Sequence, residues 1–143
     1  VLAVPSSSIR EGEHVPTALP DDIRALLSEP LFFHAATTSP DGSPQVSVIW
    51  ADIDGDLLRF STAEGRAKPR NLRRDPRIAI SFSPPEDPYR NIVLNGRAVE
   101  IEQRGMGLID HMARKYTDAD RYQWSRPGEI RVDIAVEIDR ITG

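Results

Sequence analysis

The most regular pattern in the chain is an alternation of apolar and polar positions close to its C-terminus. Between Ile130 and Asp139, isoleucine or valine occupies every second position, and the intervening residues are polar except Ala135. Successive side chains of an extended strand point to opposite faces, so this alternation predicts a β-strand.

Five earlier segments have the composition of further strands, and each ends near a turn former or a helix. They are residues 31–39, 44–53, 56–62, 77–83 and 91–102. The first is followed by the turn signal Pro40–Gly42, and Asp54–Gly55 predicts a tight hairpin after the second. Gly96 lies inside the fifth, where a glycine indicates a bulge or a close backbone approach.

Three short helices are expected between these strands. The first begins at residues 21–22 and ends before Pro30, and the second is a basic segment that follows Gly65 and ends at Asp75. The third, residues 105–116, repeats apolar side chains at the spacing of one helix face. Strands joined mainly by short hairpins do not form a βαβ series. The pattern therefore predicts a mainly β fold, a six-stranded antiparallel barrel with helices at its rim.

A barrel of this size fills its interior with its own side chains, so a large ligand must bind outside it. A second subunit is the natural source of the other wall of such a site. Residues 1–19 contain serine and proline and show no period, so we expect an N-terminal arm, either poorly ordered or wrapped around the partner. Residues 20–143 are expected to form the barrel domain.

Composition excludes several kinds of site. The chain has no cysteine, which excludes disulfides, thiolate-bound metals and a cysteine nucleophile, and favours a cytoplasmic location. No apolar stretch is long enough to suggest a membrane span. His14, His34 and His111 are scattered without the spacing of metal ligands, so no metal site is predicted. The catalytic residues stay unknown.

The net charge of −4 conceals one strongly basic segment. From Arg66 to Arg77 there are six basic residues and one acidic residue, so the segment carries +5 and the remaining chain −9. A basic island on an acidic chain favours a local anion site over nucleic-acid binding, which we do not expect.

The basic segment has the layout of a phosphate site. Ser61 and Thr62 end a strand, the chain turns at Gly65, and a helix follows in which Arg66 and Lys68 lie near the start. Unpaired N–H groups at a helix start favour an anion, and two cations would reinforce that preference. A solvated basic helix that only joins two strands is the alternative that the residues alone leave open.

Several separated blocks of the chain resemble one protein superfamily. Ser61–Arg77 is similar to the signature of the flavin and deazaflavin oxidoreductases related to pyridoxamine 5′-phosphate oxidase, and Gly42–Trp50 is similar to their cofactor-facing strand. Asp87–Arg90, Gly96–Glu100 and Ala113–Tyr116 also fit. The similarity covers about residues 20–142, and the most similar branch uses the deazaflavin coenzyme F420.

This resemblance implies a homodimeric split β-barrel of the FMN-binding type, with each cofactor in a groove at the dimer interface. It places Arg66 and Lys68 at the cofactor phosphate and assigns the remaining contacts to the ring-facing strand, the end of the next strand and the start of the helix. The implied cofactor-binding residues are Gln45, Ser47, Val48, Ile49, Trp50, Ser61, Thr62, Ala63, Arg66, Lys68, Pro69 and Asn71.

The implied function is a coenzyme F420-dependent oxidoreductase that transfers a hydride between the reduced cofactor and a small organic acceptor. An FMN-dependent oxidase or flavin reductase of the same fold is an alternative, and a non-catalytic cofactor carrier is another. Trp50 could pack in the barrel or border the cofactor, and Tyr122 and Trp124 could shape a pocket or anchor their loop. Lys115, the other lysine of the chain, is expected to be a neutral control for changes at Lys68.

Overall fold

The computed structural model describes residues 16–143, and these residues form three helices and seven strands. The helices are α1 (Asp21–Leu27), α2 (Ala67–Arg74) and α3 (Gly107–Tyr116). The strands are β1 (Phe33–Thr38), β2 (Pro44–Ile49), β3 (Asp52–Asp54), β4 (Leu57–Ala63), β5 (Arg77–Phe82), β6 (Ile92–Glu102) and β7 (Arg131–Thr142).

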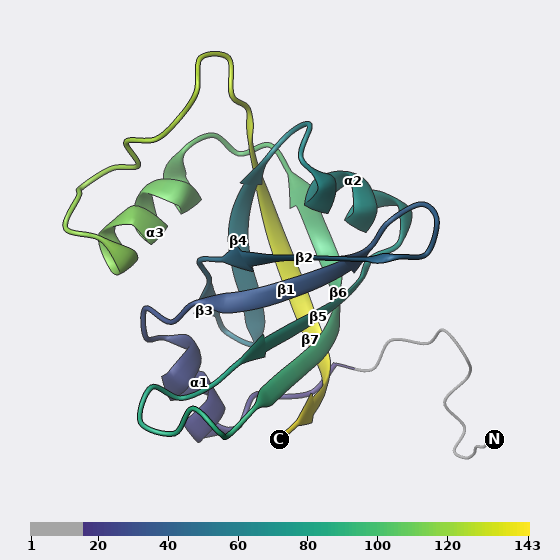
Figure 1. The fold of residues 1–143 in the computed structure, drawn as a ribbon. Coiled ribbons are helices and arrows are strands. Elements are labelled where there is room, and N and C mark those ends of the chain that lie inside the picture. The colour runs from purple at the N-terminus through teal and green to yellow at the C-terminus, as the bar shows by residue number, and fades with distance from the viewer. Residues whose placement is uncertain (1–15) are drawn as a thin grey trace.

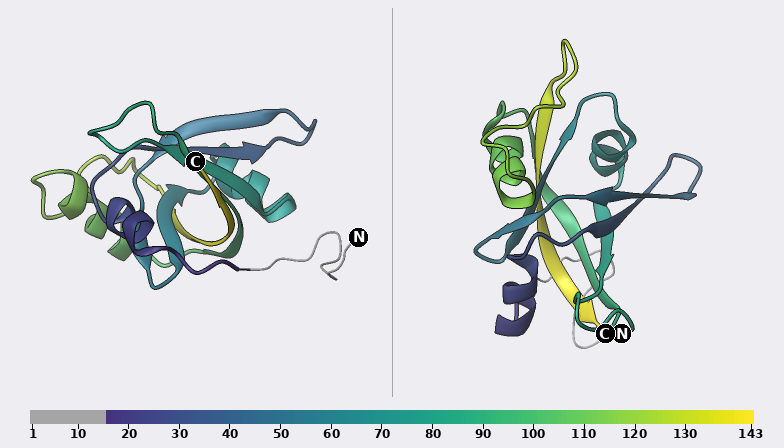
Figure 2. Two further views of the ribbon diagram at one scale, coloured as in Figure 1. Left: turned by 90° about the horizontal axis from the view of Figure 1, so that it is seen from below. Right: turned by 60° about the vertical axis from the view of Figure 1, so that its left-hand side comes forward.

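All seven strands belong to one antiparallel sheet with the order β2-β1-β5-β6-β7-β4-β3. The sheet curls so strongly that β1 and β2 cross in front of β4, β7 and β6 (Figure 1). The view from below shows the strands bending around a common centre (Figure 2). β2 and β3 are the two edges of the sheet and do not pair with each other, so the barrel is split there.

The prediction of six strands was wrong, because the expected strand 44–53 is two strands. β2 pairs with β1, whereas β3 pairs with β4 at the opposite edge of the sheet. Between them the backbone of Ala51 leaves the sheet. Its N–H donates to the Tyr116 hydroxyl (3.0 Å), and its carbonyl accepts from Lys115 Nζ (2.7 Å). Side chains of α3 thus replace the ladder hydrogen bonds where the chain changes edges.

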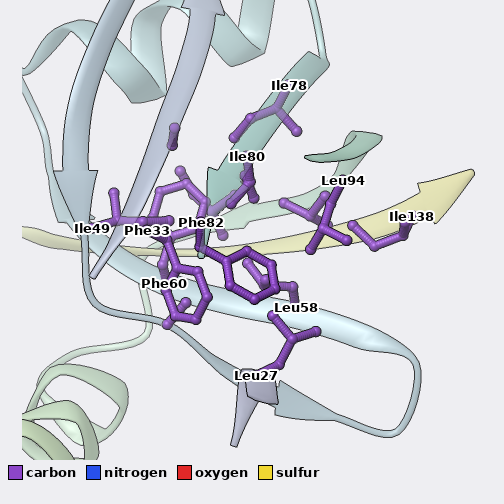
Figure 3. Close-up of a cluster of buried hydrophobic side chains, with 14 of the residues drawn as sticks. Leu27, Phe33, Ile49, Leu58, Phe60, Ile78, Ile80, Phe82, Leu94 and Ile138 are labelled. Carbon is purple, nitrogen blue, oxygen red and sulfur yellow. The ribbon is translucent and has the colours of Figure 1, made fainter. Parts of the chain in front are cut away.

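The interior of the barrel is filled by apolar side chains from nearly every strand (Figure 3). Phe33 and Phe82 meet edge to face with ring centroids 5.0 Å apart. Phe60 and Leu58 have no exposed surface, and Leu27 of α1 packs against the same cluster. A core filled in this way leaves no room for a large ligand, so any such ligand binds outside the barrel.

β7 is buried on both faces along most of its length. Arg131, Asp133 and Ala135 are buried like the valines and isoleucines between them. β7 lies between β4 and β6, and an ion pair joins Arg59 of β4 to Glu100 of β6 (3.3 Å). Alternation in the sequence therefore located this strand correctly but did not indicate which polar side chains are covered.

Gly96 lies where the register of β6 against β7 shifts, which confirms the predicted bulge and close approach. A Cβ atom at Gly96 would overlap the carbonyl oxygen of Glu137, so only glycine fits.

The N-terminal arm was predicted to extend over residues 1–19, and residues 1–15 lie outside the described part of the chain. The remainder is attached to the barrel, since Thr17 N–H donates to the carbonyl of Ile138 (2.6 Å) and Leu19 is buried. No helix among residues 16–143 is long and apolar enough to cross a membrane. Over the same residues, no cluster of histidine and acidic side chains is arranged to hold a metal ion.

Candidate functional site

A cleft of about 370 Å³ opens on the outside of the barrel, between β2, the ends of β4 and β7, and the start of α2. Side chains from these elements and from α3 line it together. The lining residues are Phe32, Gln45, Ser47, Val48, Ile49, Trp50, Ser61, Thr62, Arg66, Ala67, Lys68, Ile109, Tyr122 and Arg131.

The structure brings together nine of the twelve residues predicted to bind a cofactor. They are Gln45, Ser47, Val48, Ile49, Trp50, Ser61, Thr62, Arg66 and Lys68. Ala63, Pro69 and Asn71 do not line the cleft, although all three are buried next to it in β4 and α2. That these residues contact a cofactor stays a prediction.

Lys68 is the most informative side chain of the cleft. It is buried on α2, and its ammonium group donates to Gln45 Oε1 (3.2 Å) and to Ser47 Oγ. Both partners are neutral oxygens from β2. Burial lowers the pKa of Lys68 to about 8, because the charged form loses hydration without gaining a carboxylate. Lys68 is therefore a desolvated cation whose charge is unmatched within the described residues, and a bound anion would supply the missing counter-charge.

The start of α2 adds to this preference for an anion. Arg66 is the N-cap residue, no side chain caps the helix, and its first turn contains no acidic residue. The chain reaches this point through a turn at Gly65, whose φ of +88° favours glycine. Pro69 lies in the first turn, where its missing N–H costs nothing. The helix therefore presents unpaired N–H groups beside two basic side chains.

Asn71 supports the cleft from behind. Its Nδ2 donates to Thr37 Oγ1 (3.1 Å), and Thr37 Oγ1 donates to Gln45 Oε1 (3.4 Å). Asn71 and Thr37 are both buried, so the chain of hydrogen bonds fixes the side chain that accepts from Lys68.

Five of the nine aromatic residues gather around one end of the cleft. Trp50 stacks on Tyr116 (5.1 Å between centroids, 10° between planes) and meets Tyr122 and Trp124 edge to face. Phe32 also contacts the Tyr116 ring (6.1 Å between centroids, 48° between planes) and is 63% exposed. Trp50 therefore borders the cleft and does not belong to the barrel core. Tyr122 lines the cleft, while Trp124 packs on Tyr122 and anchors the loop (5.5 Å).

Sequence reasoning missed Arg131 and its partner Glu129. Arg131 lines the cleft from the first residue of β7, directly opposite Ala63 in the β4 ladder. Its Nη1 donates to Glu129 (3.0 Å), and Glu129 also lies 3.5 Å from Arg66. The missing information was the pairing of β4 with β7, because nearly half of the chain separates these strands and only their pairing brings Arg131 beside Ser61.

Lys115, expected from the sequence to be a neutral control for binding, is held by structural contacts that the sequence did not indicate. Its buried ammonium group donates to the carbonyls of Leu27 (2.9 Å) and Ala51 (2.7 Å) and lies 3.2 Å from Asp52. His111 contacts the same carboxylate (2.7 Å). Burial alone would raise the pKa of Asp52, but hydrogen bonds from His111, Lys115 and a backbone N–H lower it overall. These contacts join α3 to α1 and β3.

The chain is similar to a known protein family and to several solved structures. The family model described as pyridoxamine 5′-phosphate oxidase matches residues 19–141. An F420 reductase of known structure is 32% identical, with a TM-score of 0.75 over 87% of this chain and 98% of its own. The conserved hypothetical protein Rv2991 of Mycobacterium tuberculosis is 23% identical, with a TM-score of 0.68 over 94% of this chain and 88% of its own.

A more distant structure shares the fold alone. HutZ, the heme storage protein of Vibrio cholerae, is 14% identical, with a TM-score of 0.62 over 88% of this chain and 94% of its own. The architecture is thus shared by proteins with different roles, and the role of this chain has to be argued from its cleft.

Proposed function

We propose that this chain, which belongs to the pyridoxamine 5′-phosphate oxidase family, is an oxidoreductase that uses the deazaflavin coenzyme F420 to reduce a small organic acceptor. The observation that carries the proposal is the unmatched ammonium group of Lys68 at the start of α2. The 32% identity to an F420 reductase over most of both chains favours a deazaflavin over FMN.

The residues present fit a cofactor that joins a flat ring to a phosphate. Lys68, Arg66 and the first N–H groups of α2 would hold the phosphate. β2 would lie along the ring, and Trp50 with its aromatic neighbours would border the ring's apolar surface. When bound, a reduced deazaflavin supplies a hydride to the acceptor, which also takes up a proton.

This chain's own residues would bind, orient and shield the reacting groups. The aromatic cluster at one end of the cleft would exclude water, because its rings contact one another. Within the cluster, Tyr116 donates its hydroxyl proton to the carbonyl of Leu31 (2.6 Å), and burial raises its pKa to about 12. Tyr116 is therefore a structural residue and a poor proton donor.

We further propose that the working form is a homodimer whose second subunit closes the cleft. Val46 and Val48 on the edge strand β2 are 56% and 52% exposed, and Val48 lines the cleft. Two valines of an edge strand left in water beside a ligand site favour a covering surface. Sedimentation at micromolar concentration is expected to give about twice the chain mass of 15.9 kDa. A monomer that binds cofactor tightly would contradict this proposal.

Titration of the purified protein separately with coenzyme F420 and with FMN tests the choice of cofactor. The deazaflavin is expected to bind more tightly, as measured by quenching of Trp50 and Trp124 fluorescence. Stoichiometric FMN that the deazaflavin cannot displace would replace the proposal with an FMN-dependent enzyme. Tight cofactor binding with no turnover of any acceptor would favour a non-catalytic carrier.

A further inference from the structure

We infer that Arg131 is a ligand-binding residue of the cleft, and that its guanidinium group donates to an acceptor oxygen of the molecule bound there. The inference rests on the proposed function, since it takes the cleft as the cofactor site. It adds a third cationic group, on β7, to Arg66 and Lys68 at the start of α2.

Arg131 is held in one orientation from three directions. Its Nε donates to Ser61 Oγ (3.2 Å), and its Nη1 donates to Glu129 Oε2 (3.0 Å). The guanidinium carbon lies 5.1 Å from the centroid of the Tyr122 ring, in a cation–π contact. The side chain is only 3% exposed, and that of Glu129 only 6%, so both groups are removed from water. Arg131 is thus a preorganised donor whose direction is set before any ligand arrives.

One edge of this guanidinium group has no partner among the described residues. Within residues 16–143, Nη2 of Arg131 makes no hydrogen bond. In the same part of the chain, Asp133 Oδ1 is the only side-chain nitrogen or oxygen that is fully buried and unpartnered. Nη2 therefore keeps some accessible surface. Arg131 lines the cleft, and this free edge is the part of its guanidinium group that is left for a ligand there.

The chemistry of this edge limits what it can bind. A guanidinium group donates and never accepts, it stays charged at any physiological pH, and its N–H groups match oxygen acceptors. A carbonyl or anionic oxygen fits, whereas an ammonium group or a hydrocarbon does not. Such an oxygen occurs on the ring of the cofactor and on typical hydride acceptors such as quinones. Both sources offer the same acceptor chemistry, and experiment can separate them.

Two substitutions test the inference. Arg131→Gln removes the positive charge and the planar set of N–H donors. Arg131→Lys keeps a cation beside Glu129 but removes the second N–H edge. Arg140→Gln is the matched control, because Arg140 is an exposed arginine of the same strand outside the cleft. Each variant is titrated with coenzyme F420 and with 5-deazariboflavin, which lacks the phosphate, and is assayed with menadione as acceptor. Thermal unfolding identifies any variant that fails to fold.

If the oxygen belongs to the cofactor ring, both Arg131 variants bind both deazaflavins about ten- to a hundredfold more weakly, the usual effect of losing a charge-assisted hydrogen bond. If the oxygen belongs to the acceptor, cofactor affinity stays within about twofold of the parent value. The KM for menadione then rises about ten- to a hundredfold. Arg140→Gln changes neither quantity. Should Arg131→Gln not fold, Arg131→Lys decides.

Folded Arg131 variants that match the parent in both binding and KM would overturn the inference while leaving the proposed function intact. A parent protein that binds neither F420 nor FMN would instead overturn the proposed function itself.

Discussion

Both lysines of the chain are largely removed from water, since Lys68 is buried and the side chain of Lys115 is only 9% exposed, but they lie in opposite chemical surroundings. Lys115 on α3 has a carboxylate 3.2 Å away and donates to two backbone carbonyls. Lys68 on α2 contacts two neutral side-chain oxygens and faces a cleft. Burial lowers the pKa of both, but only Lys115 recovers part of the loss from a nearby negative charge, that of Asp52.

This difference separates a structural cation from a binding cation. A buried charge is tolerated in a folded protein when something matches it. At Lys115 the match is internal, so the charge stabilises the attachment of α3. At Lys68 no internal match exists among the described residues, so the folded chain carries a cost that an anionic ligand can remove. Such sites favour binding over stability.

The largest effect is expected from Lys115→Met. It leaves Asp52 without its ammonium partner and removes the Lys115 donor from the carbonyls of Leu27 and Ala51. Breaking a largely buried ion pair from one side costs about 3 kcal/mol of unfolding free energy. Urea denaturation measures this loss. Any Lys115→Met protein that remains folded should bind coenzyme F420 as the parent does. Unchanged stability would show that the attachment of α3 does not depend on this lysine.

A smaller effect, on binding and not on folding, is expected from Lys68→Met. Removing the unmatched charge should leave the unfolding free energy at pH 7 equal or higher, because the folded state no longer has to bury an ammonium group. Affinity for coenzyme F420 should fall about ten- to a hundredfold and not further, since in the proposed complex the helix N–H groups and Arg66 would still contact the phosphate.

Arg70→Met is the matched control for Lys68→Met. Arg70 is an exposed cation of the same helix and does not line the cleft, so its loss should change affinity by less than about twofold at physiological salt. Equal losses in the two variants would mean that α2 acts only through its overall charge, and the contrast between the lysines would lose its meaning.

The sequence predicted most helices and strands well. It predicted the roles of Lys68 and Lys115 only in part. Alternation located β7, and glycine and proline located the turns, because both signals are local. The break between β2 and β3 escaped notice, since it depends on Tyr116 and Lys115 reaching Ala51 from distant positions. The contacts of Lys115 depend on the same long-range packing, so the sequence suggested only that Lys115 could serve as a neutral control for changes at Lys68.

The residues of the candidate site also differ in whether local sequence or long-range pairing reveals them. Residues Ser61 to Lys68 form a continuous segment whose pattern predicts a phosphate site without any tertiary knowledge. Arg131 enters the cleft only because β4 pairs with β7, and nothing near Arg131 in the sequence distinguishes it from a surface arginine of an amphipathic strand. Long-range strand pairing is therefore the information that a single sequence lacks.

The smallest expected effect is on the pH dependence of binding, which tests whether Lys68 is the unmatched cation of the two lysines. In the free protein Lys68 has a pKa of about 8, well below the 10.5 of an ordinary lysine, because burial disfavours its charged form. A bound phosphate favours that charged form and raises the pKa in the complex. Affinity for coenzyme F420 should therefore be constant from pH 7 to about 8, and then fall by up to tenfold for each further pH unit, because binding must take up a proton.

Lys68→Arg supplies the control for this pH profile. A guanidinium group stays charged throughout the range, so the affinity of this variant should stay flat to about pH 10, whatever its absolute value. Fluorescence titrations at half-unit steps of pH measure both profiles, with thermal unfolding at each pH to establish that the protein is folded. Lys115 remains lysine in both proteins, so its own titration cannot produce the difference. A parent profile as flat as that of Lys68→Arg would mean that Lys68 is an ordinary charged lysine, and the distinction between the two buried cations would fail.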